Sequence, residues 1–336
     1  MTGPRSTSER IPLPLRLALG LALGALAVYF AAREISLDQV AAAFAGVRPG
    51  WLAAALAATF AGQFIKALRW RVMLSSEPGA PGMFTVWVYH LSGQLGNILV
   101  PGPAGDVGRI VILGGRGQGR VFTLGTVALE KVLDLVVYAF LVILVLVSLP
   151  LPAWISNSAL TLVGFAAAAA AAALAGAVYR DRLSRAWGAV LGRLPGAWGE
   201  RVRKAIRTAA GSLQAMRGRS RLVRLALTTL LLWSASILVN HWMLAAFGLS
   251  LPLSVSVLLL VVLQLGVSTN LVPGTIGLFE FLCVETLALF DVPRQVAFSY
   301  GLALHLVVLA PLVTAAVVGA LGGWRRGAWT NGRMGE

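Results

Sequence analysis

Charged residues are scarce in this sequence. Only 12% of its 336 residues are charged and 58% are hydrophobic, whereas a soluble globular domain carries about 25% charged residues. Several apolar runs reach roughly 20 residues, the length that crosses a hydrocarbon core about 30 Å thick. A water-soluble core needs no runs of that length. The composition therefore excludes a soluble globular protein and predicts an all-α polytopic membrane protein.

The sequence also has too few cysteines and histidines for a disulfide or a metal site. Cys283 is the only cysteine, so no intrachain disulfide can form. His90, His241 and His305 are scattered along the chain, and no cysteine or histidine pair has the spacing of metal ligands. The sequence also has no GxxxxGK[ST] nucleotide loop. We therefore expect no metal, no cofactor and no ATP hydrolysis by this chain.

Positive charge, in contrast, is abundant, and its placement indicates a membrane orientation. The net charge is +15, and 12 of the 28 lysines and arginines lie between Arg180 and Arg224. One basic loop between apolar segments is typical of the cytoplasmic side of a bacterial inner membrane, so we expect no nucleic-acid partner. Three arginines precede the first apolar run, 17–32, which we interpret as an uncleaved anchor rather than a signal peptide.

Six apolar segments are long enough to be full spans. They are expected at about 14–32, 51–74, 121–149, 155–179, 222–246 and 296–322. A surface helix is expected at about 35–48. The chain would form a single domain, residues 1–336, with a first half at 14–179, a basic loop at 180–221 and a second half at 222–322. The basic tails place the N-terminus and the C-terminus in the cytoplasm.

Two further apolar segments do not fit as single spans. The basic region 66–82 and the basic loop are both cytoplasmic, so 83–120 must begin and end on the same side. The same argument places both ends of 253–295 on the outer side. Each segment is interrupted by Pro-Gly, which removes a backbone donor and permits positive φ. We therefore predict two re-entrant hairpins.

The two hairpins resemble each other. The tetrapeptide LVPG occurs at 99–102 and again at 271–274, and another glycine follows each turn. The residues expected to form the turns are Pro101, Gly102, Gly105, Pro273, Gly274 and Gly277. Paired broken segments of opposite orientation suggest an inverted repeat around a binding site, although LVPG is short enough to recur by chance. Helix N-termini after such breaks attract anions.

Charged residues gather near these hairpins, although each costs roughly 2.5–3.5 kcal/mol in hydrocarbon. The candidate head-group residues are Arg69, Asp106, Arg109, Glu130, Lys131, Asp134 and Glu280. Helical spacing predicts contacts of Asp106 with Arg109 and of Lys131 with Asp134. The basic members would hold a lipid phosphate, and the acidic members would balance charge, bind a cationic head group or relay protons. Alternatively, all of them form internal salt bridges that hold the hairpins.

These motifs resemble the transmembrane region of lysylphosphatidylglycerol synthases, the flippase-like domain. The matching motifs are Leu68-Arg69-Trp70, Pro101 with Gly105-Asp106-x-x-Arg109, Glu130-Lys131-x-x-Asp134, and Pro273-Gly274-x-x-Gly277-x-x-Glu280. The resemblance covers nearly the whole chain. The family usually has Glu at Asp106, Arg at Lys131 and Gly at Thr275, and lysine lacks arginine's bidentate fork for phosphate.

The resemblance implies a polytopic domain that moves a polar lipid between leaflets. Since the sequence ends shortly after its last span, we expect no soluble aminoacyl-transferase domain and no enzyme activity. The expected partners are an anionic phospholipid or a polyprenyl-linked lipid, with a second copy or a partner synthase as further candidates. Two alternatives remain open: an intramembrane glycosyl or aminoacyl transferase with Asp106 or Glu130 as base, and a non-catalytic subunit of an envelope-lipid complex.

Overall fold

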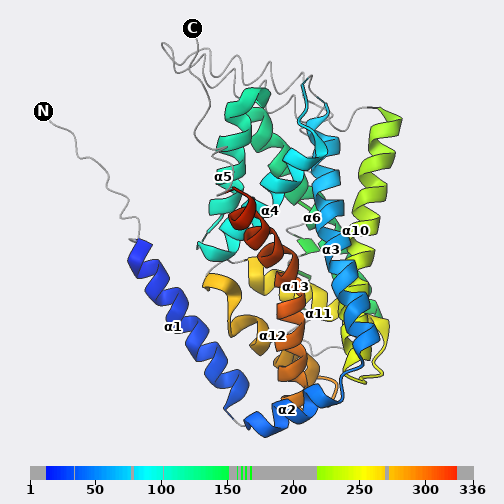
Figure 1. Cartoon of the computed structure of the whole chain (residues 1–336). Coiled ribbons are helices and arrows are strands. Elements are labelled where there is room, and N and C mark those ends of the chain that lie inside the picture. Colours follow the sequence, from blue (N-terminus) through cyan, green and yellow to red (C-terminus); the bar gives the residue numbers. More distant parts are fainter. Residues whose placement is uncertain are drawn as a thin grey trace, which may run out of the picture.

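Every element in the described part of the chain is a helix (Figure 1). The computed structural model describes residues 13–33, 35–76, 79–100, 102–150, 218–268 and 272–323, with a few positions between 157 and 168. The elements are α1 (Leu13–Ala32), α2 (Leu37–Ala45), α3 (Pro49–Leu74), α4 (Met83–Leu99), α5 (Ala104–Leu113), η1 (Gly114–Gln118), α6 (Arg120–Ser148), α10 (Arg219–Ala246), α11 (Leu253–Ser268), η3 (Pro273–Thr275), α12 (Leu278–Ala288) and α13 (Arg294–Gly323).

Four of the described helices are long and apolar enough to cross a membrane, namely α3, α6, α10 and α13. A fifth span results if Ala18–Ala32 and α2 are counted as one bent segment. The predicted polytopic helical architecture is thus confirmed, with four to five candidate spans among the described residues. Most of the sixth predicted span, 155–179, and residues 180–217 of the basic loop lie outside the described residues. α2 is the predicted surface helix and has no buried residue.

Helices α3 and α10 form an antiparallel pair that runs the length of the bundle (Figure 1). At one end, the Arg48 backbone N–H donates to the Ala246 carbonyl at 2.8 Å. At the other end, Arg221 Nη2 donates to the Ser75 carbonyl at 3.4 Å. The end of α3 and the start of α10 therefore lie at the same end of the bundle. The sequence predicted this, because the basic segments next to these two helix ends were both expected on the cytoplasmic side.

The first hairpin consists of α4 and α5. Gly102 has a φ of 94°, a value that favours glycine; Pro101 itself lies outside the described residues. One core cluster contains residues from four helix ends, namely Leu74, Val86, Leu113 and Phe122 of α3, α4, α5 and α6. The hairpin therefore begins and ends at the same end of the bundle, where α3 ends and α6 starts.

The second hairpin consists of α11, η3 and α12. Its ends share another core cluster, which includes Met243, Val255, Leu287 and Ala297 of α10, α11, α12 and α13. Ala55, near the start of α3, belongs to the same cluster. Ala55 and Leu74 are 19 residues apart, about 28 Å along a helix. The two hairpins therefore start from opposite ends of α3.

The turns of the hairpins are packed against the rest of the bundle. α4 contacts both η3 and α13, and α1 contacts η3 and α12. At Gly277, whose φ is 84°, an added Cβ would overlap the Gly24 carbonyl oxygen of α1. The neighbouring Thr275 also has a left-handed φ of 54°, which is strained for a β-branched residue.

Candidate functional site

A group of seven charged side chains lies between α3, α5 and α6, and we call it the charged cluster. Its members are Lys66, Arg69, Asp106, Arg109, Glu130, Lys131 and Asp134. Six of them are predicted site residues, and Lys66 is an addition from the structure. The three helices hold the group beside the first hairpin, in a bundle that exposes many large apolar side chains.

Arg109 links α5 to α6 and to α3. Its Nη2 lies 2.8 Å from Asp106 Oδ1 and 3.1 Å from Glu130 Oε2, and its side chain is 1% exposed. Its guanidinium carbon lies 4.8 Å above the Trp70 ring centroid, a cation–π contact. The contact with Asp106 is the pair predicted from helical spacing; the contacts with Glu130 and Trp70 join separate helices.

Arg69 makes the second connection between α3 and α6. Its Nη1 donates to Asp134 Oδ1 at 2.7 Å, and its Nη2 lies 3.7 Å from Glu130 Oε1. Because Asp134 faces Arg69, the predicted pair of Lys131 with Asp134 is wrong. Lys131 Nζ instead lies 3.3 Å from Asp106 Oδ2, and its side chain is 57% exposed. Lys131 is thus the exposed edge of a buried cluster.

The start of α5 is fixed by a side chain of α4. Asn97 Oδ1 accepts from the backbone N–H groups of Gly105 at 2.8 Å and Asp106 at 3.1 Å. In the second hairpin, Glu280 Oε2 accepts from the Gly277 N–H at 2.8 Å. Two N–H groups at the start of α5 and the N–H of Gly277, the residue before α12, therefore already bind oxygen atoms of the protein.

Glu280 lies outside the charged cluster. Its Oε1 is 2.7 Å from His305 Nδ1 of α13, and His305 Nε2 is 3.3 Å from Thr275 Oγ1. The His305 ring also stacks on Phe279 at 4.6 Å. Among the described ion pairs, none connects Glu280 with the cluster. Glu280 therefore ties the turn of the second hairpin to α13. The other six predicted head-group residues all belong to the charged cluster.

We expect Glu280→Ala to lower the melting temperature, because it leaves the Gly277 N–H and His305 Nδ1 without a partner at a cost of about 1–3 kcal/mol. Glu285→Ala is the matched control: this carboxylate is 48% exposed and lies 3.5 Å from Arg294, a surface pair that contributes about 0–1 kcal/mol. Cys283 is the only cysteine and is buried, so the reaction of a thiol-specific dye reports unfolding. Equal melting curves for the two variants would contradict the assigned role of Glu280.

Four residues that shape this region were not among the predicted site residues. Lys66 and Trp70 are one helical turn apart on α3, and Trp70 Nε1 donates to Thr126 Oγ1 at 3.2 Å. His90 is fully buried and its Nε2 lies 3.3 Å from Gln63 Oε1. Asn97 caps α5 as described above. Only helix packing places these side chains together, although the motif of Arg69 and Trp70 already pointed to one of them.

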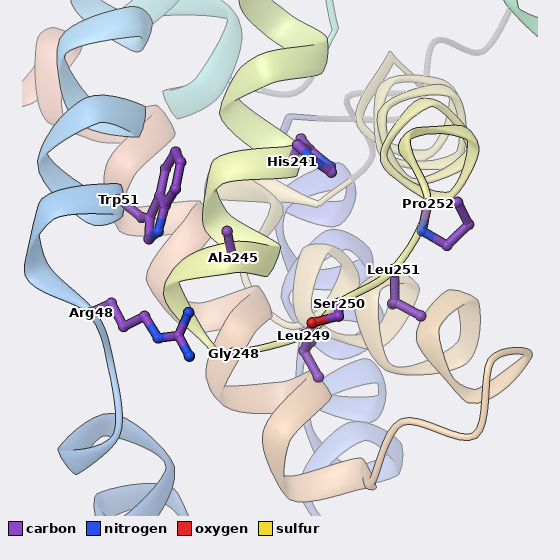
Figure 2. A pocket seen from close by; sticks show the side chains of 9 residues that line it. All are labelled: Arg48, Trp51, His241, Ala245, Gly248, Leu249, Ser250, Leu251 and Pro252. Carbon is purple, nitrogen blue, oxygen red and sulfur yellow. The ribbon is translucent and has the colours of Figure 1, made fainter.

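A pocket of about 580 Å³ lies at the opposite end of α3 (Figure 2). Arg48, Trp51, His241 and the 248–252 connection line it, and none of the predicted site residues does. This pocket is therefore separate from the charged cluster. Within the part of the chain that the structure describes, no three His, Cys, Asp or Glu side chains are grouped as a metal ion would require.

Comparison with known families identifies the family to which the chain belongs. The family described as the lysylphosphatidylglycerol synthase TM region matches residues 17–316. The chain belongs to this family. The match includes both hairpins and the whole charged cluster, and membership of this family indicates a role in the modification or transport of membrane lipids. No curated protein matches the chain.

Proposed function

We propose that this protein transports a polar lipid between the leaflets of a bacterial inner membrane, with both termini in the cytoplasm. The observation that carries the proposal is a buried charged cluster beside one of two oppositely directed helical hairpins. Broken helices facing each other in this way are the usual frame of a transporter binding site. The lipid head group would contact the cluster while its acyl chains stay in the bilayer.

The backbone chemistry of the hairpins suits insertion into a bilayer. Non-helical backbone survives at membrane depth only where it is satisfied by protein or faces water. In the first hairpin, Asn97 bonds the first free N–H groups of α5, and in the second, Glu280 bonds that of Gly277. The hairpins can therefore enter the hydrocarbon region without unpaired N–H groups at these positions.

The pairing of the carboxylates favours transport over transferase chemistry. Asp106, Glu130 and Asp134 each lie within 3.7 Å of at least one arginine or lysine nitrogen. A general base must be available to accept the proton of a reacting group, and none of these carboxylates is free of a cation. We therefore propose no reaction for the cluster and no enzyme activity for this chain.

Reconstituted vesicles test the proposal. Fluorescent phosphatidylglycerol in the inner leaflet becomes accessible to external dithionite only after it crosses the membrane. We expect the wild-type protein to accelerate this loss of fluorescence relative to protein-free vesicles. We expect Glu130→Gln to abolish the acceleration and Glu285→Gln, an exposed control, to preserve it. Exchange no faster than in protein-free vesicles, or a new lipid product in the extracted vesicles, would contradict transport.

A further inference from the structure

The turn of the second hairpin is bound to α13 through a single histidine. Nδ1 of His305 lies 2.7 Å from Glu280 Oε1, and its Nε2 lies 3.3 Å from Thr275 Oγ1. The Thr275 hydroxyl in turn donates to the Gly274 carbonyl at 2.7 Å. On the other side of the turn, Glu280 Oε2 accepts from the Gly277 N–H at 2.8 Å. Both sides of the turn are therefore hydrogen-bonded, through one side chain each, to the same imidazole.

The donors and acceptors of this network determine how many protons the imidazole carries. A carbonyl oxygen has no proton to give, so the one proton of the Thr275 hydroxyl lies in its bond to Gly274. The contact of Thr275 with His305 Nε2 then requires a proton on Nε2. Both oxygens of the Glu280 carboxylate accept, so the contact with His305 Nδ1 requires a proton on Nδ1. The arrangement is that of a histidinium paired with a carboxylate.

Loss of one proton from His305 would change the hydrogen bonds of the turn. Nε2 of the neutral imidazole is an acceptor, so the Thr275 hydroxyl would donate to it and leave the Gly274 carbonyl without this donor. The Glu280 side chain is 5% exposed, and its carboxylate would lose its cationic partner inside a membrane bundle, which is unfavourable. Thr275 already has a strained φ of 54°. The deprotonated network therefore holds the turn on α13 less firmly.

The ionisable groups around this pair are few. On α12, Cys283 is buried and interacts electrostatically with Glu280. α11, which packs against α12, has no acidic or basic residue. The ionisable side chains of the other neighbouring helices have surroundings of their own: Tyr29 of α1 and Asp38 of α2 are exposed, Lys66, Arg69 and His90 of α3 and α4 interact with Glu130, His241 of α10 contacts Ser256, and Tyr300 of α13 donates to Asn240.

We propose that the Glu280–His305 pair is a proton-binding site that controls the contact of the second hairpin with α13, and that this proton is the coupling ion of lipid transport. The inference rests on the proposed function and deepens it. With the proton bound, the pair has no net charge and holds the turn on α13. Without the proton, one buried negative charge remains and the turn can separate. Because such coupling is reciprocal, separation of the turn favours proton release, so a proton gradient can drive the movement in one direction.

A pH difference across reconstituted vesicles tests the coupling. With the interior one pH unit more acidic, we expect the wild type to exchange fluorescent phosphatidylglycerol faster than at equal pH, by up to about tenfold for one proton. His305→Asn keeps a side-chain N–H for Glu280 but does not titrate, so it should exchange lipid equally fast with and without the gradient. His241→Asn is the matched control, because His241 Nδ1 also contacts a side chain, Ser256 Oγ at 3.1 Å, and it should respond as the wild type does.

A second measurement does not depend on transport. Cys283 is the only cysteine, and α13 covers it so closely that a Cβ added at Gly301 would lie 2.9 Å from Cys283 Cβ. A thiol-specific dye therefore reacts with the native protein only when α12 and α13 separate. We expect the ratio of the wild-type labelling rate to that of His305→Asn to rise between pH 6 and pH 9, because this ratio cancels the ionisation of the thiol itself.

Each outcome bears on one of the two proposals. Wild-type exchange that ignores the gradient, or an undiminished gradient response of His305→Asn, would overturn the assignment of the coupling ion. A labelling ratio that stays constant with pH would overturn the proton site itself, even if lipid is exchanged. A rising ratio in protein that exchanges no lipid would refute transport and support the proton site. Melting curves establish that each variant is folded.

Discussion

Replacing Arg109 with alanine is expected to abolish lipid exchange and to lower the melting temperature strongly. Arg109 is 3% exposed and contacts Asp106, Glu130 and Trp70, so it joins α5, α6 and α3. Without it, Glu130 keeps only Arg69 at 3.7 Å. Removing one partner of a buried ion pair costs about 3–5 kcal/mol, because the other charge stays buried without compensation. The thiol-dye melting curve and the dithionite assay measure the two effects.

Two further variants separate charge from packing. Arg116→Ala is the matched control, since Arg116 is exposed and contacts only the Tyr89 ring, at 5.6 Å, among the described aromatic contacts; an exposed cation–π contact contributes about 0.5–1 kcal/mol. The double variant Arg109→Gln with Glu130→Gln should recover stability, because it leaves no carboxylate newly unpaired, but not lipid exchange. If Arg109→Ala were as stable and active as Arg116→Ala, the cluster would have neither a structural nor a transport role.

The second large effect is expected from Gly105→Ala. An alanine Cβ at this position would overlap the Gly93 carbonyl oxygen and lie 2.7 Å from the Asn97 backbone nitrogen. Both atoms belong to the backbone of α4, so no side chain can move aside and the two helices must separate. Overpacking typically costs about 1–3 kcal/mol, and the separation would also break the hydrogen bonds from Asn97. We therefore expect a large fall in melting temperature and loss of lipid exchange.

Gly108→Ala makes the same chemical change three residues later on the same helix. No atom lies within 4 Å of the position of its added Cβ. Alanine favours a helix by about 0.8–1 kcal/mol over glycine, so this variant should be as stable as the wild type or slightly more stable. Similar melting temperatures for Gly105→Ala and Gly108→Ala would show that α4 and α5 do not pack as the structure has them.

Much of the fold could be predicted because a bilayer constrains a sequence strongly. The spans α3, α6, α10 and α13 were predicted within a few residues from length and hydropathy alone. The parity of basic segments predicted two segments that return to their starting side, and the shared core clusters at their ends agree with this. The turns at Gly102, Gly274 and Gly277 have the positive φ that glycine permits.

The candidate site was less predictable, because helical periodicity identifies neighbours only within one helix. It correctly paired Asp106 with Arg109, but it wrongly paired Lys131 with Asp134. Asp134 binds Arg69, 65 residues earlier in the chain. Glu280 was grouped with the other candidate head-group residues because of its charge, whereas the structure places it on His305, 25 residues later.

The sequence by itself determined that this chain is a helical membrane protein, where its long helices run, and where Pro-Gly interrupts two further apolar segments. These properties depend on apolar length, on the distribution of basic residues and on Pro-Gly breaks, all of which are local. Only the tertiary structure decided which charges neutralise each other. Ion pairs between helices depend on the rotation and depth at which the helices pack, and these are set by small-residue contacts such as that of Gly93 with Gly105.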